Sequence, residues 1–306
     1  MTESRGKNLE TLLGRVIPEW RTEILECSKI SGGMTNENYC VRVHQTPFFV
    51  RLAGDGTEQL GIDRDVEYLA TVTAGDLGVA PPVKFYVREE RILVTEFVIG
   101  KSMSPEDFRD AHRLRQVVDL LHRTHQRQPA VKPFSVFHVI RSYWNLVRGN
   151  HDRVTRQLEA ALQLGTLIEE RLPFQPLGLC HNDLLAANFV LQESTQQLWL
   201  VDWEYAGLGN LYFDLGNFAS NQKLSADQEV LLANLYFETD QVCHHVAAIR
   251  LMRIMSDLRE SLWGMVQRLV SPLDFDFEQY AMEHFSRVQQ ALDDPRIQAE
   301  LDLLGS

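Results

Sequence analysis

The chain is poor in cysteine, and the few cysteines it has form no motif. Four cysteines stand far apart among 306 residues, and no two of them make a CxxC pair. This spacing excludes a cysteine-rich metal site and a disulfide framework. Reduced thiols in a cytoplasmic protein are the simplest explanation, so we expect a cytoplasmic location.

The chain also lacks positive charge and long hydrophobic runs. Its net charge is −12 and it has no basic tract, so we expect no nucleic-acid partner. An acidic surface favours a small cationic partner, with solubility alone as the plainer alternative. No stretch approaches the roughly 20 apolar residues that a membrane span requires. The polar first ten residues have no apolar core, so we expect no signal peptide there.

What is present is typical of a soluble globular chain, with 44% hydrophobic and 24% charged residues. The periodicity predicts strands at 24–31, 39–44, 48–52, 83–87 and 91–98, with one helix from about residue 62. It predicts helices at 105–127, 137–172 (in two pieces), 225–237, 243–270 and 275–292, interrupted by a strand-rich stretch at 177–202. We therefore predict an α+β fold with two lobes, a small β-rich N-terminal lobe (1–98) and a larger, mainly helical C-terminal lobe (99–306).

The most informative pattern is an aspartate and an asparagine five residues apart, Asp183 and Asn188, followed by Asp202. Phosphoryl transfer needs a carboxylate that orients the attacking hydroxyl and oxygen ligands that hold magnesium on the nucleotide phosphates. Asp183 suits the first task, and Asn188 with Asp202 suits the second, since a predicted hairpin brings these two to one end of paired strands. Glu204 is a further candidate magnesium ligand, or simply bonds to water. With the order of the elements, the pattern predicts a protein-kinase-like fold.

Other residues near these motifs have two interpretations each. His181 either takes part in catalysis or, as histidines in such loops more often do, braces the loop through backbone hydrogen bonds. The turn with Gly32 and Gly33 either approaches nucleotide phosphates or only closes a hairpin. Arg51, on a predicted strand, either pairs with Glu67 to hold phosphates or lies in water at a sheet edge.

A predicted helix near the C-terminus carries two acids and a glycine on roughly one face with a tryptophan adjacent to them, and the next helix carries Tyr280. Asp257, Glu260 and Gly264 lie at i, i+3 and i+7, and Trp263 is the adjacent tryptophan. Carboxylates beside aromatic rings can hold a quaternary ammonium by charge and cation–π attraction. Core packing of the rings with solvated acids is the alternative.

Taken together, these motifs resemble the choline/ethanolamine kinase family, within the aminoglycoside-phosphotransferase-like kinases. The resemblance runs from about residue 30 to residue 280. Its parts are residues 31–39, the Arg51 strand, Arg64 and Glu67, and residues 180–183, 201–207, 213–217, 261–264 and 280.

The resemblance implies ATP- and Mg²⁺-dependent phosphorylation of the hydroxyl of a small cationic amino alcohol, most simply choline, and a homodimer as one possible assembly. It places the catalytic loop at His181, Asp183 and Asn188, and the metal ligands at Asn188, Asp202 and Glu204. The nucleotide-binding residues that it implies are Gly33, Thr35, Asn36, Asn38, Arg51, Glu67, Glu96, Phe97 and Val98. The substrate-binding residues that it implies are Asp183, Glu204, Tyr205, Asn221, Glu260, Trp263 and Tyr280.

Two positions depart from the eukaryotic choline kinases, which carry a second tryptophan at the position of Val266 and a glutamate at that of Asn221. Ethanolamine, thiamine and aminoglycosides therefore stay open as acceptors. The alternative from another functional class, that of proteins without catalytic activity, is a nucleotide-binding pseudokinase. The presence of Asp183, Asn188 and Asp202 together speaks against it.

Overall fold

The computed structural model describes residues 2–23, 25–30, 33–54, 56–149, 155–239 and 242–305. The chain divides into two compact units, Met1–Lys101 with Val190–Glu204, and Ser102–Phe189 with Tyr205–Ser306. The first is built on a β-sheet and the second is mainly helical, which confirms the predicted α+β, protein-kinase-like fold. No helix among the described residues is both long and apolar enough to cross a membrane.

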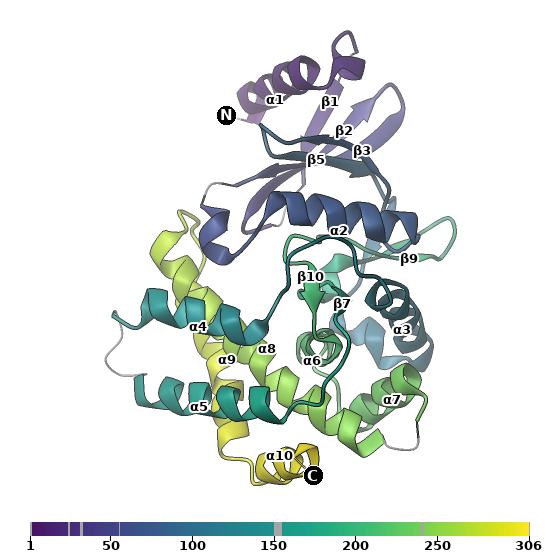
Figure 1. Cartoon of the computed structure of the whole chain (residues 1–306). Helices are drawn as coiled ribbons and strands as arrows, with labels where there is room; N and C mark the ends of the chain where they lie inside the picture. Colours follow the sequence, from purple (N-terminus) through teal and green to yellow (C-terminus); the bar gives the residue numbers. More distant parts are fainter. Residues whose placement is uncertain are drawn as a thin grey trace. The chain divides into compact units, whose positions relative to one another are not determined.

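The first unit contains a five-stranded antiparallel sheet in the order β1-β2-β3-β5-β4 (Figure 1). The strands are β1 (Leu25–Lys29), β2 (Asn36–Val43), β3 (Thr46–Ala53), β4 (Val83–Val87) and β5 (Ile92–Glu96). The register places Arg51 of β3 between Asn38 of β2 and Leu93 of β5. Arg51 is therefore on a central strand, which excludes the edge-strand interpretation.

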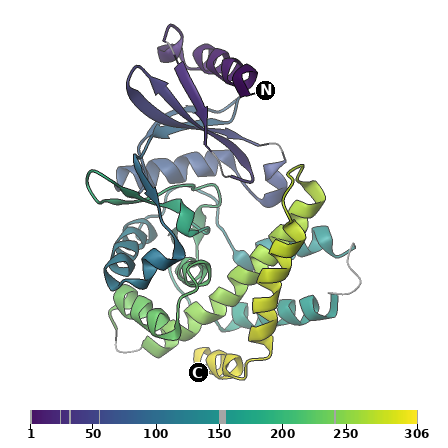
Figure 2. The ribbon, with the colours of Figure 1, turned by 180° about the vertical axis from the view of Figure 1, so that it is seen from behind.

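Two helices, α1 (Thr2–Val16) and α2 (Arg64–Asp76), accompany this sheet. Leu9 and Leu13 of α1 pack in one core cluster with Val50 of β3 and with residues of the neighbouring strands. Because successive side chains on a strand point to opposite faces, Arg51 points away from that cluster. Its partner there is Glu67 of α2. Figures 1 and 2 agree in placing α1 and α2 on different sides of the sheet.

A second, three-stranded sheet has the order β6-β8-β9 and is made by β6 (Gly100–Ser102), β8 (Phe189–Gln192) and β9 (Leu198–Leu200). The backbone amide of Leu200 donates to the carbonyl of Val79 (2.9 Å), and that of Glu193 donates to Ile99 (3.2 Å). These bonds tie residues 190–204 to the first unit. The two units therefore differ from the predicted lobes, which are each continuous in sequence.

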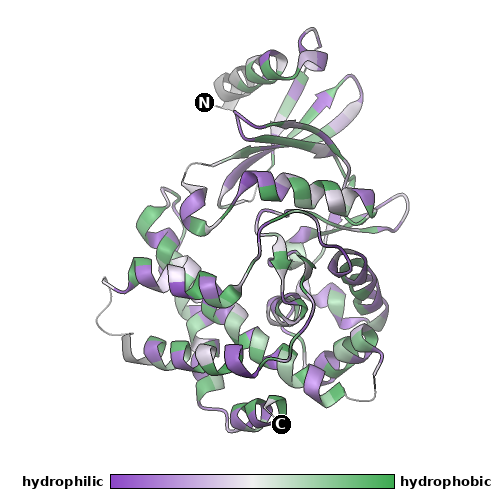
Figure 3. Cartoon of the chain, in the orientation of Figure 1, coloured by the Kyte–Doolittle hydropathy of each residue, from purple (hydrophilic) through white to green (hydrophobic). Residues whose placement is uncertain are grey.

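The second unit is assembled around α8 (Val242–Val270), most of whose residues are buried. The other helices are α3 (Ala111–His125), α4 (Val136–Val147), α5 (Thr155–Arg171), α6 (Leu211–Asn221), α7 (Ala226–Phe237), α9 (Phe277–Leu292) and α10 (Arg296–Leu304). Figure 2 shows α9 running beside α8. The helices of this unit carry both hydrophobic and hydrophilic residues (Figure 3), as amphipathic helices around a shared core do. The short strands β7 (Gly178–Cys180) and β10 (Gly207–Gly209) pair antiparallel.

Several predicted elements need correction. The predicted helix 105–127 is a 3₁₀ turn, Pro105–Arg109, and then α3, because Asp110 has extended backbone and its carboxylate caps the new helix at His112. Helices α1, α6 and α10 are absent from the prediction. In α6 the reason is Gly216, which lowers the helix propensity of its segment. An added Cβ there would lie 2.6 Å from the backbone nitrogen of Arg253, so close packing against α8 requires the glycine.

Candidate functional site

The loop that follows β7 carries Asp183, and a buried aspartate of α6 fixes its start. Both oxygens of the Asp214 carboxylate accept hydrogen bonds from this loop, from the amides of His181 (2.8 Å) and Asn182 (2.7 Å). Asn182 has positive φ (64°), a conformation that asparagine tolerates better than most residues. Its side chain donates to the carbonyl of Tyr205 (2.9 Å), which ties the loop to the strand β10 segment. The loop conformation is thus fixed on both sides of Asn182.

Asp214 belongs to a closed buried cluster with His125 and Cys180. His125 Nε2 lies 3.0 Å from Asp214 Oδ2, and its Nδ1 lies 2.7 Å from the Tyr236 hydroxyl. Burial by itself raises the pKa of Asp214, but the hydrogen bond and charge of His125 and the loop contacts of His181 outweigh it and lower the pKa. The three side chains are close enough to share a metal ion. Both imidazole nitrogens already have partners, however, so the cluster is best explained as the support of the loop.

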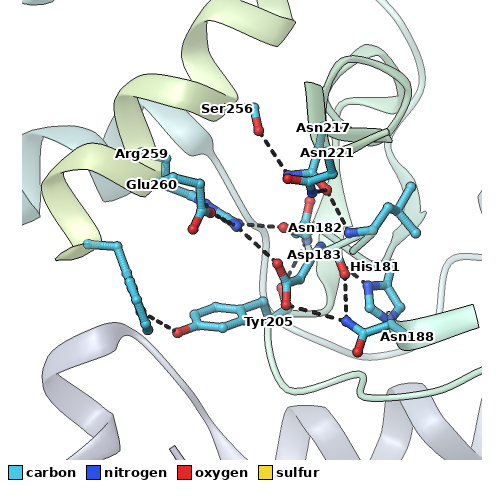
Figure 4. Close-up of polar contacts among 12 residues, drawn as sticks. His181, Asn182, Asp183, Asn188, Tyr205, Asn217, Asn221, Ser256, Arg259 and Glu260 are labelled. Carbon is cyan, nitrogen blue, oxygen red and sulfur yellow. Dashed lines mark hydrogen bonds and ion pairs between the residues drawn. The ribbon is translucent and has the colours of Figure 1, made fainter. Parts of the chain in front are cut away.

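Within the loop, Asp183 and Asn188 are brought together. The side-chain amide of Asn188 donates to the Asp183 carbonyl (2.9 Å) and reaches the Asp183 carboxylate at 3.5 Å. The Asp183 amide donates to Nδ1 of the buried His181 (3.2 Å), a contact of the kind that the bracing role of His181 requires. Figure 4 shows Asp183 and Asn188 pointing toward one another.

Two helices hold the middle of this loop. The amide of Leu184 donates to Oδ1 of Asn217 on α6 (2.6 Å), and Asn217 in turn donates to Ser256 of α8 (2.9 Å). Asn221, predicted to contact substrate, donates to Asn217 (3.2 Å) and lies beside it (Figure 4). Its role in substrate binding stays a prediction.

Arg259 of α8 is the site residue that the sequence prediction missed. Its guanidinium binds the Asn182 carbonyl and Oε1 of Glu260, and lies 3.4 Å from Oδ1 of Asp183. It also lies over the ring of Tyr205, 5.4 Å from the centroid. The available signal was an arginine next to Glu260, but the predicted helix carries three other arginines, and nothing in the local sequence distinguishes a buried arginine from a solvated one.

The predicted aromatic group also gathers in this unit. Trp263 donates from Nε1 to the Tyr205 hydroxyl (2.9 Å), and its ring centroid lies 5.6 Å from that of Tyr280. The Tyr280 hydroxyl donates to Glu260 Oε2 (2.7 Å). Burial and the neighbouring Glu260 carboxylate raise the pKa of Tyr280, so this hydroxyl remains a donor. Four of the predicted substrate-binding residues, from three segments of the chain, are therefore neighbours.

The first unit brings together the residues predicted to hold phosphate. Arg51 Nη1 lies 2.5 Å from Glu67 Oε1 and 2.8 Å from Asp202 Oδ1, and its side chain is almost fully buried. Burial alone would lower the pKa of Arg51, but the carboxylates of Asp202, Glu67 and Glu204 outweigh it and raise the pKa. Arg51 is therefore a permanent cation beside Asp202, which has positive φ (69°).

Glu204, predicted as a metal and substrate ligand, has both oxygens engaged within the same unit. Oε1 accepts from the Thr35 hydroxyl (2.7 Å), and Oε2 accepts from the Asn36 amide (2.8 Å) and from Arg64 (3.2 Å). Burial, with the nearby Asp202 carboxylate, raises the pKa of Glu204. The contacts make Glu204 the anchor of the segment that carries Thr35 and Asn36.

The glycines near this segment allow close approach of the backbone. Gly33 has φ of +94°, and an added Cβ would lie 3.0 Å from the Asn38 side chain. A Cβ on Gly54 would lie 2.2 Å from the Thr35 carbonyl. Gly32 lies outside the described residues.

The predicted adenine-binding segment, Glu96–Val98, begins at the last residue of β5. The exposed Glu96 pairs with Lys84 (2.6 Å). The role of the segment in binding adenine stays a prediction.

The predicted metal ligands fall in different units. Asn188 belongs to the second unit, and Asp202 and Glu204 belong to the first. A magnesium ion shared by Asn188 and Asp202 therefore stays a prediction.

The fold and these two groups of residues define a class. A β-rich unit with a buried Arg51–Glu67 pair, and a helical unit whose loop presents Asp183 and Asn188, are the parts of a protein-kinase-like phosphotransferase. The profile of one family, choline/ethanolamine kinase, matches residues 27–230. The chain therefore belongs to the choline/ethanolamine kinase family, whose members phosphorylate an alcohol group.

Individual relatives agree with this membership. The chain is 25% identical to ethanolamine kinase 2 of Mus musculus, over 90% of this chain and 78% of that protein. It is 24% identical to probable choline kinase 3 of Arabidopsis thaliana, over 91% of this chain and 89% of that protein. Among solved structures, a choline/ethanolamine kinase family protein from Mesorhizobium loti superposes with a TM-score of 0.82 at 23% identity, covering 98% of this chain and 99% of that one.

Proposed function

We propose that this protein transfers the γ-phosphoryl group of ATP, with Mg²⁺, to the hydroxyl of a small amino alcohol, and that choline is the acceptor, giving phosphocholine. One observation carries the proposal. Asp183 is held in a loop that α6 and α8 both brace, beside a group of aromatic side chains and one paired carboxylate.

Asp183 is the residue that acts on the acceptor. Its carboxylate is only partly buried, so it can accept a hydrogen bond from a substrate hydroxyl and take the proton as the phosphoryl group arrives. Because the loop is fixed before substrate binds, the carboxylate costs little reorganisation when it acts.

The nucleotide side of the reaction is assigned to Arg51, Glu67, Asp202 and Asn188. Arg51 is a permanent cation suited to the α- and β-phosphates, and Glu67 keeps it in place. The donor atoms fit magnesium, since Asp202 offers a carboxylate and the amide nitrogen of Asn188 is already used on Asp183, which leaves its oxygen for a ligand. When bound, the ion neutralises charge on the transferred phosphoryl group. Glu204 is bound by Thr35, Asn36 and Arg64, which supports an anchoring role for it.

The acceptor's cationic end is assigned to Tyr205, Trp263 and Tyr280. A quaternary ammonium gains roughly 0.5–2 kcal/mol at each aromatic face that it contacts. Ethanolamine is the second candidate, and a specific contact favours it. Arg259 already places a cation over the Tyr205 ring, which leaves less aromatic surface for three methyl groups.

The test is ATP consumption by the purified protein with Mg²⁺ and one acceptor at a time: choline, ethanolamine, thiamine or an aminoglycoside. Asp183→Asn is the matched blank because it keeps the size of the side chain and removes the base. Turnover with choline that disappears in the blank supports the proposal in full. Turnover with ethanolamine alone would show that ethanolamine, and not choline, is the acceptor. No turnover above the blank with any acceptor contradicts the enzymatic function and favours a silent nucleotide-binding protein.

A further inference from the structure

Arg259 is a buried cation, and the proposed function gives it no role in the reaction. Its side chain is only 4% exposed, and it lies in the middle of α8 among buried residues. Removing a charge of this kind from water costs several kcal/mol unless its partners compensate. A position that needs only helix packing would carry an apolar residue at lower cost.

The partners of Arg259 come from four segments of the chain. They are the Asn182 carbonyl and one oxygen of Asp183 in the loop after β7, the Glu260 carboxylate of α8 itself, the Tyr205 ring of the β10 segment and the Phe213 ring of α6. Figure 4 shows Arg259 and Glu260 extending from α8 toward the loop. The planar guanidinium has donors in a rigid fork, so it fixes the directions of its acceptors as well as their charge.

The same contacts also determine how Asp183 is oriented. Its Oδ1 faces Arg259 at 3.4 Å, and its Oδ2 faces the Asn188 amide at 3.5 Å. A carboxylate with a donor on each oxygen has one favoured orientation, whereas one with a single donor can rotate about its terminal bond. Glu260 is likewise held between Arg259 and the Tyr280 hydroxyl. Arg259 thus connects Asp183 directly with Tyr205, and through Glu260 with Tyr280; both tyrosines are assigned to the acceptor.

We propose that Arg259 is a positioning residue that sets the orientation of Asp183 relative to Glu260 and to the residues assigned to the acceptor, Tyr205, Trp263 and Tyr280. The proposal rests on the function assigned above, in which Asp183 acts on the acceptor. Arg259 stays positively charged. Burial alone would lower the pKa of Arg259, but the charges of Glu260 and Asp183 outweigh the effect of burial and raise the pKa, and Tyr143 of α4 adds to this effect.

The test compares Arg259→Lys with wild type in steady-state kinetics. Lysine keeps the charge and most of the length, but one ammonium nitrogen replaces the planar fork of three nitrogens that reach Asn182, Asp183 and Glu260 from different directions. We expect kcat to fall by about 30-fold, as misplacement of a reacting group by an ångström costs on the order of 100-fold. The KM for ATP should change by less than about twofold, since Arg51 and Glu67, which are assigned to the phosphates, belong to the first unit, while the acceptor KM rises.

Arg253→Lys is the matched control on the same helix. Arg253 is also paired, with Glu229 (2.5 Å) and the Leu224 carbonyl (3.1 Å), but touches none of the residues assigned to catalysis. It should lose some stability and keep the wild-type kcat. A kcat for Arg259→Lys within twofold of wild type overturns the proposal. So does a loss that Arg253→Lys shares, because that loss would reflect the helix and not the site.

Crystal structures of wild type and Arg259→Lys give a readout that does not depend on turnover. A changed or divided orientation of the Asp183 carboxylate in the variant supports the proposal, and an unchanged, single orientation overturns it. If wild-type protein shows no turnover above Asp183→Asn, the assigned function fails, and the structures still decide whether Arg259 positions Asp183.

Discussion

At the scale of single residues, several functional side chains are held by partners distant in sequence. Asp183 contacts Arg259, 76 positions away, and Glu204 accepts a hydrogen bond from Thr35, 169 positions away. The sequence prediction identified Asp183, Asn188, Arg51 and Glu67 as candidates because their spacing is a local property. The sequence prediction could not identify Arg259, because the role of an arginine in a helix depends on which residues the tertiary structure places next to it.

Trp263→Ala should weaken acceptor binding and leave ATP binding unchanged. Loss of one aromatic face costs roughly 1–2 kcal/mol of cation attraction, so the acceptor KM should rise by about 10-fold. The measurement is KM for choline, for ethanolamine and for ATP. Trp144→Ala on α4 is the matched control and should change none of them. An equal rise for acceptor and ATP would refute the assignment of Trp263 to the acceptor.

Asp214→Asn should destabilise the protein at neutral pH. It should also make the free energy of unfolding decrease less as the pH is lowered into the acid range. The folded-state pKa of Asp214 is lowered, so its contribution is complete above the unfolded-state pKa of about 3.9 and is lost as the pH falls through the lower folded value. Removing one partner of a buried pair costs about 3 kcal/mol. Urea unfolding at pH 7 and at about pH 2.5, below the unfolded-state pKa, checks this, and a difference between variant and wild type that is as large at the lower pH as at pH 7 would contradict it.

At the scale of elements, the close packing of α6 against α8 decides where the loop is held. Asn217 and Ser256 meet across this contact, and Gly216 makes the close approach possible. The prediction for this region failed because local propensity disfavours a helix around Phe213–Asn217, whereas tertiary packing favours it. The long apolar face of α8, in contrast, has a clear period and was predicted within a residue of its observed bounds.

Gly216→Ala should therefore destabilise the protein although alanine is the better helix former. The added methyl would lie 2.6 Å from the Arg253 backbone nitrogen, which only a shift of one helix can relieve, and overpacking of this kind costs about 2 kcal/mol. Gly149→Ala, with nothing within 4 Å of the added atom, is the control and should stay within about 0.5 kcal/mol of wild type. Denaturant midpoints of both variants are the measurement, and equal midpoints would show that α6 and α8 can separate freely.

At the scale of the whole molecule, stability comes from the hydrophobic cores of the two units and from buried polar clusters. The four cysteines are free: Cys180 is buried, Cys27 and Cys40 are partly buried, and Cys243 is exposed. None of them forms a cross-link, which agrees with the absence of a cysteine motif in the sequence. The protein should therefore unfold at the same temperature with and without a reducing agent.

Thiol labelling of the native protein should follow this order of exposure. Cys243 should react first with a disulfide reagent at pH 8, and Cys180 should react only on unfolding, since burial raises its pKa well above the usual range. Cys27 should be slow, because burial, together with the charge of Glu10, raises its pKa to about 12. Mass spectrometry of the labelled peptides reads the order, with Cys243→Ser as the control that removes the fast phase. Fast labelling of Cys180 in the native protein would contradict its burial in β7.

The sequence by itself determined the α+β class, the order along the chain of the strands in the five-stranded sheet and of most helices, and the spacing of Asp183, Asn188 and Asp202, because periodicity and motif spacing are properties of neighbours along the chain. Only the tertiary structure decided that residues 190–204 return to the first unit, that Glu204 is occupied by Thr35, Asn36 and Arg64, and that Arg259 faces Asp183. Those outcomes depend on buried charges finding their partners across the fold, and such pairs leave no periodic trace in the sequence.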